Sequence, residues 1–199
     1  MLLHIQLLFS GISYFFGYIL IVIKLGHFML TGFQFRAAKS LLEYTFRDIA
    51  NVIGIHETTL VRFANTQNLQ YIRGVSHNII MIKDFFEQKN ILFPKEHTIS
   101  LKRDDAFLQS NNTNLTRFQL KASRIASGLT QDELSHYTKL SSSSISLLEH
   151  KNNMEYIESS KIQIPVLRRF FEHLGITFPD DLTVTLIKDP KILVKKKQK

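Results

Sequence analysis

The sequence predicts a mainly α-helical protein made of two tandem small helical bundles, each ending in a short β-strand, with a hydrophobic N-terminal helix in front. Three observations predict this architecture: a long internal duplication, helix-capping signals that recur in both copies, and an uncharged apolar stretch at the start of the chain. Hydrophobic residues make up 44% of the 199 residues and charged residues 21%, a balance typical of folded proteins.

The duplication aligns residues 33–104 with residues 118–189 at a constant offset of 85 positions and without a gap. Seventeen of the 72 aligned positions are identical, where chance would give roughly a quarter of that number. We therefore expect two copies of one domain, a first repeat at 29–104 and a second repeat at 118–189. The linker between them, 105–117, contains a polar stretch at 110–114, and residues 190–199 form a basic tail.

Both repeats show the same order of helix signals. In the second repeat a first helix ends at Gly128, and Thr130 and Glu133 have the spacing of a capping box. A later helix has Pro165 in its first turn and ends at Gly175. The strands expected at 98–101 and 183–186 alternate apolar and polar residues, which predicts half-buried strands. The other signals are Thr45, Asp48 and Asn90, and the apolar faces of the later helices are Met81, Ile82, Phe85 and Phe86 in the first repeat and Val166, Leu167, Phe170, Phe171 and Leu174 in the second.

Between these helices the second repeat reads LTQDELSHYTKLSSSSISLLE at 129–149. The apolar residues of this segment fall where two short helices joined by a tight turn would share a core, and the first repeat has apolar residues in the corresponding places. They are Leu134, Leu140, Ile145 and Leu148 in the second repeat and Ile49, Ala50, Ile55, Leu60 and Phe63 in the first. This segment resembles the helix-turn-helix of the Xre/phage-repressor family, with its Leu-Thr-Gln-x-Glu-Leu opening and Ile-Ser-x-x-Glu close. The resemblance extends over both repeats and includes the run Glu172 to Phe178.

The resemblance implies two repressor-like helix-turn-helix bundles whose recognition helices, 56–64 and 141–149, lie in the major groove of DNA. Arg62 suits guanine, Glu57 suits cytosine, and Val61 or Leu147 suits a thymine methyl group. Lys121, Arg124, Arg36 and Lys39 on the first helices are expected phosphate contacts. The expected DNA-binding residues are Gln131, Ser141, Ser142, Ser143, Ser146 and Leu147 in the second repeat and Glu57, Thr58, Val61 and Arg62 in the first.

The two repeats depart from the family pattern in different places. The first repeat keeps the turn glycine as Gly54 and a small residue before it as Ala50, whereas the second has Lys139 and Ser135 there. The first repeat in turn has Phe46 where the family has Gln, which removes a phosphate contact. We therefore leave open whether both repeats bind DNA.

These features predict a sequence-specific, DNA-binding transcriptional regulator that is not an enzyme and uses no cofactor or metal. The net charge of +8 and the pI near 9.7 favour a polyanionic partner, here double-stranded DNA. The chain has no cysteine, and its histidines lack metal-ligand spacing. The alternatives are an antitoxin-type or protein-interaction module on the same fold, or a membrane-anchored regulator.

The last alternative depends on residues 1–28. The segment from residue 2 to residue 23 carries no Asp, Glu, Lys or Arg, and it is long enough to span a bilayer as a helix. Either this segment is a membrane anchor, giving a single-pass protein with a cytoplasmic C-terminal region, or the protein starts at Met29 and is cytoplasmic and associated with the nucleoid. The lysine-rich tail is either a solvated end or a phosphate contact. The two short strands are expected to pair, within one chain as a pseudo-twofold or between chains as self-association.

Overall fold

The computed structural model describes residues 29–103, 114–150, 152–157 and 163–190. The hydrophobic segment at 1–28, most of the linker and the tail after residue 190 lie outside the described residues. None of the helices in the described ranges has the length and apolar character needed to cross a membrane.

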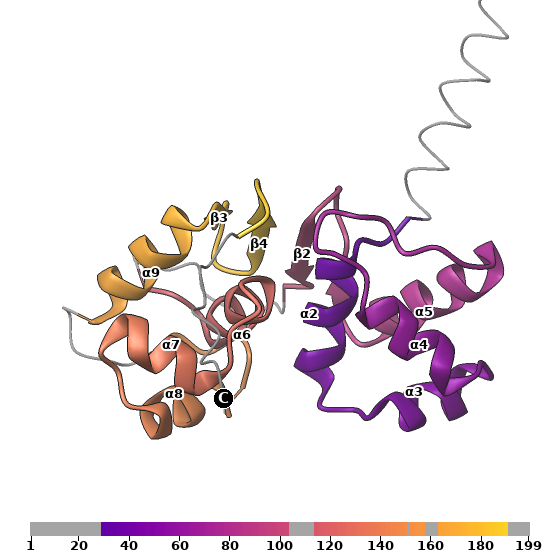
Figure 1. Cartoon of the computed structure of the whole chain (residues 1–199), viewed down its shortest axis with the longest axis horizontal. Helices are drawn as coiled ribbons and strands as arrows, with labels where there is room; N and C mark the ends of the chain where they lie inside the picture. The colour runs from indigo at the N-terminus through magenta and orange to yellow at the C-terminus, as the bar shows by residue number, and fades with distance from the viewer. Residues whose placement is uncertain (1–28, 104–113, 151, 158–162, 191–199) are drawn as a thin grey trace, which may run out of the picture.

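The described residues form eight helices and four short strands, so the fold is mainly helical with a small antiparallel sheet (Figure 1). The order of four helices and two strands occurs twice. The elements α3, α4, β1 and β2 of the first repeat recur at the sequence offset of the duplication as α7, α8, β3 and β4. The elements are α2 (Gly32–Leu42), α3 (Phe46–Ile53), α4 (Glu57–Ala64), α5 (Ser76–Gln88), β1 (Ile91–Leu92), β2 (Thr98–Leu101), α6 (Arg117–Ala126), α7 (Gln131–Thr138), α8 (Ser142–Glu149), α9 (Gln163–His173), β3 (Ile176–Thr177) and β4 (Thr183–Leu186).

Capping boxes start the first two helices of each repeat. The boxes predicted at Thr45 and Thr130 are present, since each hydroxyl accepts from the third helical N–H and the third side chain bonds back. Two further boxes begin α2 at Thr31 and α6 at Thr116. The second of these, with Leu115 and Arg117, lies in the stretch that the sequence assigns to the linker, yet all three residues are buried in the second repeat.

Left-handed residues end the helices where the sequence predicts them. Gly128, Gly175 and Asn90 have φ of 67°, 86° and 64°. One predicted apolar residue is misplaced: Val166 on α9 is 44% exposed, because α9 turns Leu167 and Phe171 inward instead. The buried apolar residues of both repeats form one connected core.

The sheet joins the two repeats within the chain. Its strand order is β1-β2-β4-β3, and β2 pairs antiparallel with β4. Ile99 faces Val184, which is its own counterpart in the duplication, so the pairing is pseudo-twofold about that pair. The N–H of Leu101 donates to Leu182 at 3.0 Å, and the N–H of Leu186 donates to His97 at 2.9 Å, which are again symmetry-related bonds.

The strands are more buried than their alternation predicts. All four residues of β2 are buried, as are three of the four of β4, so the expectation of half-buried strands is wrong. The hydroxyl-bearing face is also covered, because Thr98 and Thr185 bond to each other at 3.0 Å. The Gln34 amide donates to the Thr98 carbonyl at 2.8 Å, which places the start of α2 against the strand.

Helices α2 and α6 form the second half of the contact between the repeats, side by side at the centre of the molecule (Figure 1). The Asn68 amide donates to the carbonyl of Ala126 at 2.9 Å, and the Asn153 amide donates to that of Leu41 at 3.5 Å. These two bonds are counterparts in the duplication. The whole described structure is therefore an intramolecular pseudo-dimer.

Candidate nucleic-acid interface

Two helix pairs, α3–α4 and α7–α8, lie at opposite ends of the molecule on the side away from the sheet (Figure 1). In each pair, two helices of eight residues are joined by three residues, beginning with Gly54 at φ 69° or Lys139 at φ 60°. The inner faces share a core, in which Ile49 and Leu60, or Leu134 and Ile145, are fully buried. Each pair therefore holds its second helix firmly and leaves the outer face of that helix uncovered.

The outer face of α8 carries serines and one exposed leucine. Ser141 caps the helix, since its hydroxyl accepts from the Ser144 N–H at 3.1 Å. The Ser142 hydroxyl donates to the Asp132 carboxylate of α7. Ser143 is exposed, Ser146 is half-buried, and Leu147 is 64% exposed. These side chains offer donors, acceptors and an apolar contact without any net charge.

The outer face of α4 is charged. Glu57 forms an exposed ion pair with Arg47, with 3.6 Å between Oε2 and Nε. Thr58 shares a hydrogen bond of 2.8 Å with the His56 ring. Val61 is 39% exposed, and the exposed Arg62 guanidinium lies over the Phe63 ring. Of the four residues predicted in this helix, Thr58, Val61 and Arg62 are therefore exposed and Glu57 is half-buried.

Gln131 belongs to a buried polar cluster rather than to a free surface. Its amide donates to Glu149 at 3.0 Å, and the same carboxylate accepts two bonds of 2.6 Å from the Arg124 guanidinium. Arg124 also donates to the Leu129 carbonyl at 2.9 Å. The side chains of Arg124 and Glu149 are only 11% and 2% exposed. The cluster ties α6, α7 and α8 together, so the structure does not support Arg124 as a phosphate contact.

The first repeat fills the same three positions without an ion pair. Lys39, Phe46 and Ala64 are the counterparts of Arg124, Gln131 and Glu149. The Lys39 ammonium lies 5.0 Å above the Phe46 ring. The two repeats therefore reach the same helix arrangement by polar and by apolar packing.

Two arginines that the sequence did not single out for this role hold the ends of α4 and α8. Arg36 donates to the Ala64 carbonyl at 2.8 Å and to that of Thr66, and Arg117 donates to the Leu148 carbonyl at 2.7 Å. A cation at a helix C-terminus satisfies orphan carbonyls and meets the negative end of the helix dipole. Burial lowers the pKa of Arg36. Its predicted role as a phosphate contact is not supported.

These two arginines are not counterparts, which is why the alignment hides them. Arg117 corresponds to Gly32, where a Cβ would lie 2.3 Å from the Thr66 carbonyl oxygen. Arg36 corresponds to Lys121, which pairs instead with Glu43 across the contact between repeats at 3.4 Å. Lys121 therefore also has a partner within the molecule, whereas the Lys39 ammonium lies over the Phe46 ring.

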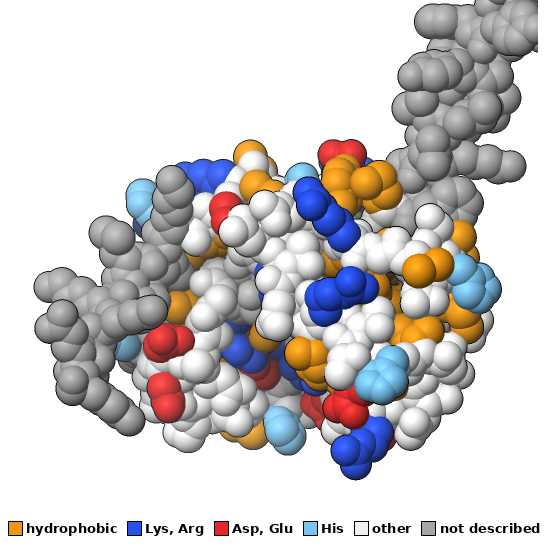
Figure 2. Space-filling view, turned by 45° about the vertical axis from the view of Figure 1, so that its right-hand side comes forward, with side chains coloured by type: hydrophobic (Ala, Val, Ile, Leu, Met, Phe, Trp, Pro, Cys, Tyr) orange, Lys and Arg blue, Asp and Glu red, His pale blue; other side chains and the backbone are white. Residues whose placement is uncertain are grey.

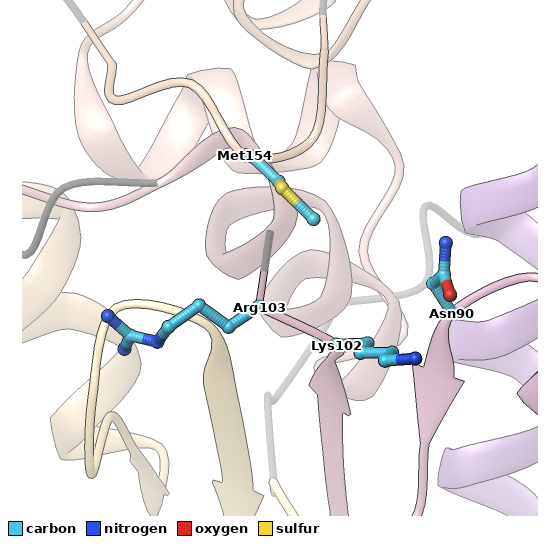
Figure 3. A pocket seen from close by; sticks show the side chains of 4 residues that line it. All are labelled: Asn90, Lys102, Arg103 and Met154. Atoms are coloured by element: carbon cyan, nitrogen blue, oxygen red, sulfur yellow. The ribbon is translucent and has the colours of Figure 1, made fainter. Parts of the chain in front are cut away.

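The rest of the described surface mixes side chains of several chemical types. On the face that Figure 2 shows, Lys and Arg side chains are interspersed with acidic, apolar and neutral ones. A pocket where the repeats meet is lined by Asn90, Lys102, Arg103 and Met154, and the two basic side chains point away from each other (Figure 3). No group of three or more metal-ligating side chains gathers within the described ranges.

Comparisons with known proteins add no relative. No protein-family model, curated protein or solved structure matches the chain. The resemblance to the Xre/phage-repressor family therefore rests on the residue motifs alone, and the function that it implies is a proposal.

Proposed function

We propose that this chain is a sequence-specific DNA-binding transcriptional regulator with two tandem repressor-like helix-turn-helix domains, 29–104 and 118–189. The observation that carries the proposal is the paired placement of α4 and α8. Each is the second helix of a tight pair, each has a buried inner face, and each presents an uncovered outer face on the side away from the sheet. An α-helix of this kind fits the major groove of B-DNA.

The side chains on these outer faces suit base edges. Arg62 can donate two parallel bonds to guanine, and the serines of α8 can donate to or accept from any base edge. Leu147 can contact a thymine methyl group. At the start of each helix, the backbone N–H groups that the His56 or Ser141 side chain does not cap, together with the helix dipole, favour a phosphate nearby.

The pseudo-twofold relation between the repeats supports binding to two half-sites of a duplex. Dimeric helix-turn-helix proteins place their recognition helices about one helical turn apart, which centres their half-sites roughly 10 base pairs apart. The β2–β4 pair and the α2–α6 contact supply the equivalent relation here within one chain. We therefore expect one chain to occupy a bipartite site.

Selection from a pool of random duplex DNA with the full chain, followed by sequencing, tests the proposal. Arg62→Ala should cost about 1 to 3 kcal/mol at one base position and leave the other positions unchanged. The matched control is Arg169→Ala, which removes an exposed arginine from α9 and should change neither the motif nor its information content. Failure of the wild-type chain to enrich any sequence contradicts the proposal.

A protein-interaction module is the second candidate, because an exposed apolar residue recurs at one position of both repeats. Val52 on α3 is 66% exposed and its counterpart Tyr137 on α7 is 41% exposed. Exposed apolar residues at equivalent places suit a protein partner. This candidate predicts no sequence enrichment from random DNA, and loss of partner binding on Val52→Ser or Tyr137→Ser.

A further inference from the structure

The backbone places the same side-chain positions of α4 and α8 in equivalent surroundings. The two helices have equal length, begin at counterpart residues and are related by the pseudo-twofold of the β2–β4 pair. In a symmetric dimer identical side chains occupy such positions, and the best binding site is therefore a palindrome.

Here no outward position carries the same residue in both repeats. The counterpart pairs are Glu57 and Ser142, Thr58 and Ser143, Val61 and Ser146, and Arg62 and Leu147. The last pair differs most. Arg62 presents a guanidinium fork, whereas Leu147, at 64% exposure, presents only hydrocarbon and can neither donate nor accept a hydrogen bond.

We infer that the DNA site of this chain is non-palindromic and is read in one orientation. This inference rests on the proposed function. The first repeat takes a half-site with a guanine opposite Arg62, and the second repeat takes a half-site with a thymine methyl group opposite Leu147. The other three pairs of positions add further differences between the half-sites without restoring symmetry.

The two repeats also differ in charge. In the first repeat Arg47, Arg62 and Arg73 are exposed, and residues 33–104 hold ten Lys and Arg against seven Asp and Glu. In the second repeat Arg117 is buried and the Arg124 side chain is only 11% exposed, and residues 118–189 hold eight Lys and Arg against nine Asp and Glu. The first repeat therefore has the more positive net charge of the two, which gives the two half-sites unequal roles in affinity.

The test exchanges the two side chains that differ most. Arg62→Leu and Leu147→Arg place each residue at its counterpart's position, and both positions are exposed, so folding should be unaffected. The wild-type chain should select two unlike half-sites roughly 10 base pairs apart. Arg62→Leu should lower the preference for guanine in one half-site by roughly 5- to 150-fold. The double exchange should move that guanine preference to the other half-site.

Each outcome bears on the inference. A palindromic motif for the wild-type chain overturns it while leaving a DNA-binding function in place, since two chains would then present the same repeat. A motif of a single half-site, or a guanine that does not move in the double exchange, also overturns it. Failure of the wild-type chain to enrich any sequence instead contradicts the proposed function itself. Unchanged circular dichroism and thermal midpoints of the variants exclude misfolding as the cause of any change in their selected motifs.

Discussion

Removing one partner of the Arg124–Glu149 ion pair should destabilise the second repeat more than removing both partners together. Both carboxylate oxygens of Glu149 accept at 2.6 Å from the guanidinium, and the Glu149 side chain is only 2% exposed. Arg124→Met keeps most of the volume but leaves that carboxylate with the Gln131 amide as its remaining side-chain partner.

The expected cost follows from this environment. Removing one partner of a buried pair costs about 3 to 5 kcal/mol, and the retained bond from Gln131 places Arg124→Met near the lower end, at about 3 kcal/mol. Glu149→Ala should cost about 2 kcal/mol, because the more exposed Arg124 keeps its bond to the Leu129 carbonyl. The double variant leaves no buried charge and should cost about 2 kcal/mol, which is a coupling energy of about 3 kcal/mol.

Urea unfolding of the four proteins, followed by circular dichroism, measures this cycle. The two repeats share one core, so one cooperative transition with an unchanged slope is expected and the shifts in midpoint give the differences in unfolding free energy. Additive losses, with the double variant about 5 kcal/mol less stable, would refute the reasoning. A cost below about 0.5 kcal/mol for Arg124→Met would show that the pair is solvated.

Three further predictions concern a turn, a helix cap and the contact between the two repeats. Lys139→Gly should raise the free energy of unfolding by about 1 kcal/mol, and the thermal midpoint with it, because Lys139 has φ 60° and the first repeat has glycine at the counterpart position. The backbone N–H and the hydroxyl of Thr130 lower the pKa of Glu133, so its contribution is present above the unfolded pKa and is lost as pH falls through the folded value; Glu133→Gln should flatten the acid limb of stability in urea titrations at decreasing pH. Asn68→Ala removes bonds of 2.9 and 2.7 Å to the second repeat and should cost about 1 to 2 kcal/mol, whereas Asn153→Ala, which loses a bond of 3.5 Å, should cost less than half as much in the same denaturation assay.

The features that the sequence predicted depend on residues three or four positions apart. The capping boxes at Thr45 and Thr130 and the left-handed positions at Gly128 and Asn90 belong to this class. The duplication also predicted the repeated order of elements, because a repeat needs no knowledge of contacts. The two-residue strands β1 and β3 were missed, since two residues carry no alternation to detect.

The features that the sequence could not predict depend on contacts between distant residues. Arg36 and Arg117 hold equivalent helix ends from non-equivalent positions, and Gly32 allows this by letting a neighbouring loop approach closely. Arg124 was predicted to meet phosphate because it is basic and near the helix pair, but Glu149, 25 residues later, neutralises it. The charge of a residue in the sequence therefore does not show whether it is available to a partner, because several basic residues are used inside the fold.

The β2–β4 pair makes the association of the two repeats a unimolecular event. Proteins that pair through separate chains dissociate on dilution, so the concentration of their paired form at low abundance rises with the square of the total concentration. In this chain the tether replaces that equilibrium with a fixed effective concentration of one repeat for the other. Used as a DNA-binding protein, it would occupy its site along a simple hyperbola in concentration, so that occupancy below saturation rises in proportion to the number of molecules, down to the lowest cellular copy numbers.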